Sequence, residues 1–64
     1  MNALNAIKSL RKAVLDNPSE NFVYKINGWD VRYKAYPADV YIAEKDGKHF
    51  IRKNEAILAS IISK

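Results

Sequence analysis

The chain contains no cysteine, so no disulfide holds its fold together and no thiolate is available to bind a metal ion. This absence fits a reducing compartment, and we expect a cytoplasmic protein. Its apolar runs are far shorter than the roughly 18 residues of a transmembrane helix, so we expect no membrane partner. Residues 1–15 lack a charged segment ahead of an apolar block, and the sequence therefore predicts no signal peptide.

Residue types that carry chemistry are also scarce. Histidine occurs once, at His49, so the chain lacks the ligands of a typical metal site and the partners of a Cys–His catalytic pair. The two glycines, Gly28 and Gly47, are each explained by a turn, which leaves no glycine-rich loop for a phosphate group. We therefore expect a protein that is not an enzyme, with no cofactor and no bound metal. One alternative stays open, because a single histidine can act as acid or base in metal-independent RNA cleavage.

Length and charge narrow the possibilities further. With 64 residues the chain should form one small domain, spanning residues 1–64. Eleven Lys and Arg residues against seven Asp and Glu residues give a net charge of +4. A positive balance favours nucleic acid or an acidic protein surface as partner, although small proteins also carry net charge for solubility.

Two segments have the apolar pattern of helices. The first predicts a helix from about Ala3 to Asp16, with Asn2 as its N-cap. Asn17-Pro18 should end it, because the residue before proline is disfavoured in the α region. The second helix is predicted from Glu55 to about Ser63, with Asn54 as its cap. Its apolar residues surround most of its circumference, so it is either wedged between the sheet and the first helix or offers a face to a second copy in a homodimer.

Residues 23–36, VYKINGWDVRYKAY, alternate apolar and charged residues around an Asn-Gly pair. This pattern predicts a hairpin with a two-residue type I′ turn, and such a turn fixes the strand register. The predicted pairs are Ile26 with Trp29, Lys25 with Asp30, Tyr24 with Val31, Val23 with Arg32 and Phe22 with Tyr33. The large apolar side chains then share one face of the hairpin, and the basic side chains share the other.

A second hairpin is predicted from Val40–Glu44 and Lys48–Lys53, around Lys45-Asp46-Gly47. A two-residue Asp-Gly turn would set Lys45 opposite Lys48, which is a like-charge pair. We therefore favour a three-residue loop that sets Glu44 opposite Lys48. This register pairs Ile42 with Phe50 on one face and Tyr41 with Ile51 on the other, and it leaves open which face is buried. Val40, Ile42 and Phe50 offer the larger apolar area, so we expect them to face the core and Tyr41 to face water.

Together these elements predict an α+β fold with an N-terminal helix, an antiparallel meander of three or four strands, and a C-terminal helix. Both helices should cover one sheet face, because the apolar residues of the first hairpin need cover there. The opposite face stays open to water and collects basic and aromatic side chains. We expect this face to bind nucleic acid through phosphate contacts and base stacking. The predicted phosphate contacts are Lys25, Arg32, Lys34 and Lys53, and the predicted stacking residues are Tyr36 and Tyr41.

Residues 40–62, VYIAEKDGKHFIRKNEAILASII, resemble in layout the closing half of a double-stranded-RNA-binding domain: strand, short glycine turn, strand, then a helix begun by basic residues. The resemblance implies the same helix–sheet–helix order. Only Arg52 and Lys53 stand where that family places a lysine cluster, and its Gly-Pro-x-His loop has no counterpart, so no binding residues carry over. Residues 47–50, GKHF, are similar to the Gly-Ser-His signature of small toxin ribonucleases of the HicA type, which share that fold and use a strand histidine.

The leading hypothesis is a small non-enzymatic binding module that uses its open basic sheet face on nucleic acid. The main alternative is a protein-interaction module, such as a small inhibitor or adaptor encoded by a phage or mobile element, which docks a host protein. A His49-dependent ribonuclease is the third hypothesis.

Overall fold

The computed structural model describes residues 2–35 and 38–63 of the chain. These residues form a helix, four strands and a second helix, in that order. The elements are α1 (Ala3–Asp16), β1 (Tyr24–Ile26), β2 (Trp29–Lys34), β3 (Val40–Lys45), β4 (Lys48–Arg52) and α2 (Glu55–Ile62). The predicted α+β class and element order are confirmed.

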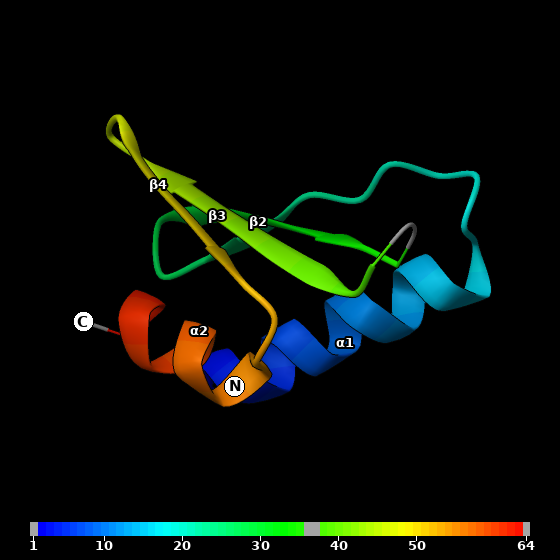
Figure 1. The fold of residues 1–64 in the computed structure, drawn as a ribbon, viewed down its shortest axis with the longest axis horizontal. Coiled ribbons are helices and arrows are strands. Elements are labelled where there is room, and N and C mark those ends of the chain that lie inside the picture. Colours follow the sequence, from blue (N-terminus) through cyan, green and yellow to red (C-terminus); the bar gives the residue numbers. More distant parts are fainter. Residues whose placement is uncertain (1, 36–37, 64) are drawn as a thin grey trace.

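The four strands form one antiparallel sheet in the order β1-β2-β3-β4, so each strand pairs with its neighbour in the sequence. Both helices lie on the same side of this sheet, as predicted (Figure 1). Helix α1 contacts β1 and β2, helix α2 contacts β3 and β4, and the helices contact each other. The molecule therefore has two layers, with one sheet face covered by helices.

Asparagine caps begin both helices, as predicted. The Asn2 side chain accepts a hydrogen bond from the Asn5 backbone N–H at 2.8 Å, and Asn54 accepts one from the Ile57 N–H at 3.0 Å. Each bond satisfies a backbone donor that has no partner inside the helix. The Asn54 cap also fixes where the chain leaves β4 and turns back as α2.

The first hairpin has the predicted turn. Asn27 and Gly28 both adopt positive φ, at 52° and 83°, as a type I′ turn requires. The three pairs next to the turn match the predicted register: Tyr24 with Val31, Lys25 with Asp30, and Ile26 with Trp29. The two outer pairs are absent because β1 begins at Tyr24. Phe22 packs against the core from outside the ladder instead.

The second hairpin corrects the sequence-based register. Asp46 and Gly47 both adopt positive φ, at 49° and 80°, so the loop has two residues and not three. Lys45 therefore lies opposite Lys48, and the pairing runs through Glu44–His49, Ala43–Phe50, Ile42–Ile51 and Tyr41–Arg52. The repulsion expected between Lys45 and Lys48 therefore does not prevent the two-residue turn. The Lys45 ammonium lies 5.7 Å from the centroid of the Trp29 ring, where a cation–π contact offsets repulsion.

This one-residue shift exchanges the two faces of β3. Tyr41 and Ala43 point into the core, at 2% and 0% exposure, so the prediction that Tyr41 faces water is wrong. The prediction that Val40 and Ile42 face the core is wrong as well, because both lie on the sheet face opposite to that of Tyr41 and Ala43. Phe50 does lie on the helix side, half-buried against the core.

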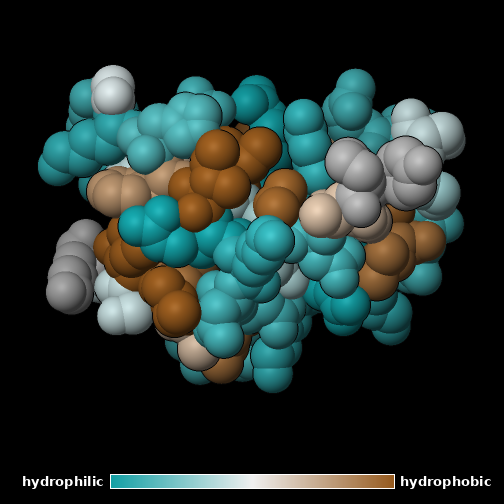
Figure 2. Space-filling model, in the orientation of Figure 1, coloured by the Kyte–Doolittle hydropathy of each residue, from teal (hydrophilic) through white to brown (hydrophobic). Residues whose placement is uncertain are grey.

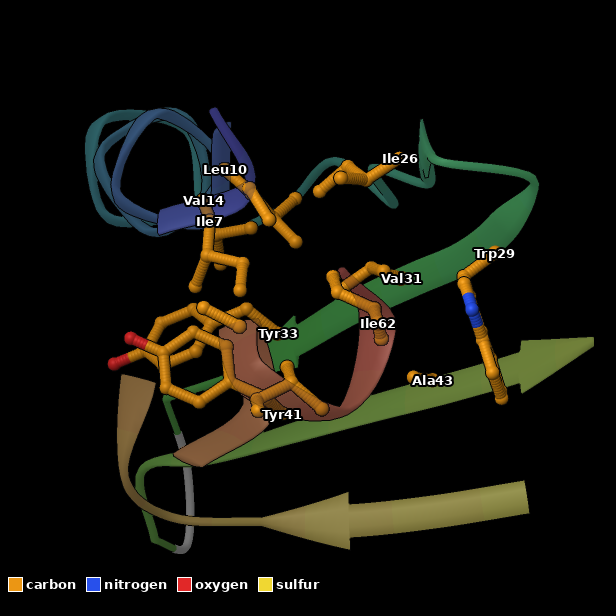
Figure 3. Close-up of a cluster of buried hydrophobic side chains, with 13 residues drawn as sticks. Ile7, Leu10, Val14, Ile26, Trp29, Val31, Tyr33, Tyr41, Ala43 and Ile62 are labelled. Carbon is orange, nitrogen blue, oxygen red and sulfur yellow. The ribbon is translucent and has the colours of Figure 1, made fainter. Parts of the chain in front are cut away.

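Between the layers, side chains from both helices meet those of β1, β2 and β3 (Figure 3). The Tyr33 and Tyr41 rings lie side by side, with centroids 4.8 Å apart, and the Trp29 and Phe50 rings are 5.5 Å apart. The buried residues are Ala3, Ile7, Leu10, Val14, Ile26, Trp29, Val31, Tyr33, Tyr41, Ala43, Leu58, Ala59 and Ile62. Helix α2 contacts both α1 and the sheet, but its Ile57 side chain points outward and is 52% exposed.

Candidate binding face

The sheet face opposite the helices carries alternate residues of all four strands, because side chains alternate along a strand. We call this set the open face. It consists of Lys25 on β1, Asp30, Arg32 and Lys34 on β2, Val40, Ile42 and Glu44 on β3, and His49 and Ile51 on β4.

Two ion pairs neutralise much of the charge on the open face. The Lys25 ammonium lies 3.6 Å from the Asp30 carboxylate, and the Arg32 guanidinium donates to Glu44 at 3.1 Å. The four side chains are between 46% and 72% exposed, so each pair contributes about 1 kcal/mol or less to stability. The pairs also lower the positive potential of the open face, because carboxylates lie beside two of its three predicted phosphate ligands, Lys25 and Arg32. Lys34 forms no ion pair with any other described residue.

An apolar strip crosses the open face beside these pairs. Ile42 lies between Arg32 on one side and Ile51 on the other in the cross-strand register. Ile51 is 51% exposed and Ile42 is half-buried, although no element covers either side chain. Figure 2 shows hydrophobic side chains, in brown, gathered among hydrophilic ones over β3 and β4. The open face is therefore mixed, with an apolar strip next to paired charges.

The six predicted contact residues do not form one surface. Lys25, Arg32 and Lys34 lie on the open face, as predicted. Tyr36 lies outside the described residues. Tyr41 is in the core, where its buried ring is not available to stack on a base. Lys53 follows β4 and lines a different hollow, at the start of α2.

That hollow has a volume of about 350 Å³ and was not predicted from the sequence. Its lining residues are Arg11, Asp39, Tyr41, Lys53, Asn54 and Glu55. The Tyr41 hydroxyl donates to Glu55 at 2.8 Å, and the neighbouring Tyr33 hydroxyl donates to Asp39 at 2.6 Å. The Arg11 guanidinium lies 6.0 Å from the Tyr33 ring centroid. These residues come from four distant segments, so no sequence spacing indicates the cluster.

The two tyrosines of this cluster are held in their neutral form. Burial raises the pKa of the Tyr41 hydroxyl above its ordinary value, and the hydrogen bond to Glu55 raises it further. Burial also raises the pKa of Tyr33, with Asp39 adding to the rise and Arg11 opposing it. The carboxylates accept these hydrogen bonds and the tyrosines do not ionise near neutral pH, so the cluster links α1, the sheet and α2 without offering an activated nucleophile.

His49 lies exposed on the open face, directly opposite Glu44. Its role in RNA cleavage stays a prediction. The described part of the chain contains no group of three or more His, Cys, Asp or Glu side chains arranged to hold a metal ion. Within the same residues, neither helix has the length and apolar character needed to cross a membrane.

Comparison with protein families, with curated proteins and with solved structures found no match to this chain. The function has to be inferred from the chemistry of the open face itself.

Proposed function

We propose that this chain is a small non-enzymatic binding module, and that the open face of its sheet binds a protein. The observation that supports this partner is the apolar strip of Ile42 and Ile51 beside two ion pairs. Protein interfaces combine an apolar centre with a polar rim, whereas nucleic-acid interfaces are much more positively charged. The carboxylates of Asp30 and Glu44 would repel phosphates but would suit a protein partner with donors of its own.

The test is capture of the partner from the native host by the tagged chain, followed by mass spectrometry. Ile42→Glu places a carboxylate in the apolar strip, and Ile57→Glu makes the same change at an exposed site on α2. We expect one defined protein with the wild type and with Ile57→Glu, and its loss with Ile42→Glu. Circular dichroism checks that both variants fold. If Ile57→Glu alone loses the partner, α2 is the binding surface and the proposal is wrong.

Nucleic acid is the second candidate, supported by the net charge of +4 and by two basic residues at one end of the sheet. Lys34 and Lys53 lie at that end, outside both ion pairs. If they contact phosphates, Lys34→Ala/Lys53→Ala should reduce the slope of log K against log salt by about 1.5. Lys8→Ala/Lys48→Ala removes the same charge elsewhere and is the matched control. Gel-shift titrations at several salt concentrations measure both, and equal slopes would rule out this candidate.

A further inference from the structure

The outer edge of β4 is unpaired in the sheet of described residues, because β4 is last in the strand order. The two-residue turn makes Lys45–Lys48 a hydrogen-bonded pair, and such pairs alternate along an antiparallel ladder. Lys48, Phe50 and Arg52 therefore bond to β3. His49 and Ile51 direct their backbone N–H and C=O groups outward, away from the sheet. Of these four groups, the Ile51 C=O already accepts a hydrogen bond from the Arg52 guanidinium at 2.7 Å.

This edge is more open than the one at β1. Strand β1 has three residues, and only Lys25 directs its backbone groups outward by the same alternation. Strand β4 has five residues, with neither proline nor a bulge to protect it. Helix α2 contacts β4 from the helix side of the sheet, below β4 in the view of Figure 1. Both outward N–H groups and the His49 C=O remain to begin a new ladder, and a strand that also bonds the Ile51 C=O must displace the Arg52 guanidinium.

The side chains along β4 indicate what kind of strand would pair with its outer edge. Lys48 and Arg52 flank half-buried Phe50 on the helix side, and the Arg52 guanidinium lies 5.5 Å from the Phe50 ring centroid. Exposed Ile51 lies on the open-face side, and Lys53 follows directly. A second copy of β4 would place Lys48 near the other copy's Arg52, so like charges oppose pairing between copies. Charge complementarity therefore favours an acidic occupant.

We propose that the β4 edge binds an extended acidic segment of the partner protein as a fifth strand. This inference rests on the proposed function. Main-chain hydrogen bonds to the His49 N–H and C=O and to the Ile51 N–H hold the segment, as in other cases of strand addition. On the helix side its carboxylates lie opposite Lys48 and Arg52, with an apolar residue opposite Phe50. On the other side its apolar residues extend the strip of Ile42 and Ile51 on the open face.

The probe is a labelled peptide with the core Glu-Val-Val-Val-Glu between Gly-Ser ends, a pattern that reads the same in both strand directions. The control peptide replaces both Glu residues with Lys. Fluorescence anisotropy should detect binding of the acidic peptide to the full chain and none of the basic one. Equal binding of both peptides would remove the charge argument and overturn the proposal.

A matched pair of variants tests the backbone contact. His49→Pro removes an outward N–H without breaking the ladder to β3, while His49→Ala removes the side chain and keeps the N–H. We expect His49→Pro to weaken peptide binding about tenfold, near the upper end for one lost hydrogen bond, and His49→Ala to weaken it less than about threefold. Equal loss in both variants would mean that the side chain, and not the edge, makes the contact.

Hydrogen exchange on the wild-type chain gives a readout that needs no variant. Bound peptide should slow exchange of the His49 and Ile51 amides and leave Lys48, Phe50 and Arg52, already bonded to β3, unchanged. If the peptide fails to bind while the captured host protein still depends on Ile42, the edge inference is wrong and the proposed function stands. If the peptide binds the edge and no captured protein depends on Ile42, the proposed function is wrong. Protection of the same amides by RNA alone would also overturn the edge inference.

Discussion

At the residue scale, Tyr41 contributes both apolar area and a hydrogen bond to the fold. Its ring packs on Tyr33 in the core, and its hydroxyl reaches Glu55 at the start of α2. Tyrosine suits this position because its body is apolar and its tip is polar. The sequence alone gives no reason to prefer Tyr41 over Ile42 for burial, since both residue types favour strands. The hydrogen bond to α2 depends on a tertiary contact that no local pattern predicts.

The raised pKa of Tyr41 predicts a specific loss of stability in alkali. The unfolded tyrosine has a pKa of about 10, and the folded value is higher. The contribution is therefore complete below about pH 10 and is lost as the pH rises above it. Tyr41→Phe removes this titration, so its free energy of unfolding should fall less steeply than that of the wild type as the pH rises above about 10.

Urea unfolding at each pH measures the effect, with Tyr24→Phe as the control. Lysine deprotonation acts on all three proteins alike and cancels in the comparison. The difference in slope is at most about 1.4 kcal/mol per pH unit for one proton. Parallel curves for Tyr41→Phe and Tyr24→Phe would contradict the prediction.

At the element scale, the two hairpins show when a turn sequence is enough to predict the strand register. Asn27-Gly28 predicted its turn and register correctly, because both residues tolerate positive φ and the alternation around them is unbroken. Asp46-Gly47 is an equally suitable pair, but the like-charge lysines beside it misdirected the prediction. That penalty is below about 1 kcal/mol for exposed side chains. Burial of Tyr41 and Ala43 beside the core-facing Tyr33 and Val31 of β2 contributes more free energy than this penalty removes.

The second register can be tested by a pair of neighbouring substitutions. Tyr41→Ala should cost about 3 kcal/mol or more, as for other large aromatic residues in cores. That is a large share of the stability of a domain of this size, which is about 3–10 kcal/mol. Ile42→Ala, on the open face, should cost about 1 kcal/mol. Thermal unfolding followed by circular dichroism distinguishes them. The reverse order would support the three-residue loop.

At the scale of the whole molecule, the element order and the position of the helices could be predicted, and so could the place of Lys25, Arg32 and Lys34. Their surroundings could not. Glu44 reaches the open face only in the two-residue register, and there it pairs with Arg32. The predicted basic face was therefore missing an acidic residue. Charge on a sheet face depends on the register of every strand, so one error in β3 changed both the charge and the apolar content of the site.

The same distribution of charge bears on self-association. A dimer through α2 was predicted as one possibility, and Ile57 is the one described α2 residue among the large, exposed apolar side chains. A stable interface buries about 800 Å² on each partner, which is a large share of the 4417 Å² surface of this molecule. One exposed isoleucine cannot supply that area. The β4 edge could support pairing between copies, but its basic side chains oppose it.

We therefore expect sedimentation equilibrium to find a monomer at low salt. Raising the salt to about 1 M shortens the Debye length to about 3 Å and screens the repulsion between β4 edges. Any dimer that then forms should be lost in His49→Pro, which removes an edge donor, and retained in Ile57→Glu, which changes only α2. A dimer already present at low salt and lost in Ile57→Glu would place self-association on α2, because its contacts are apolar and independent of screening.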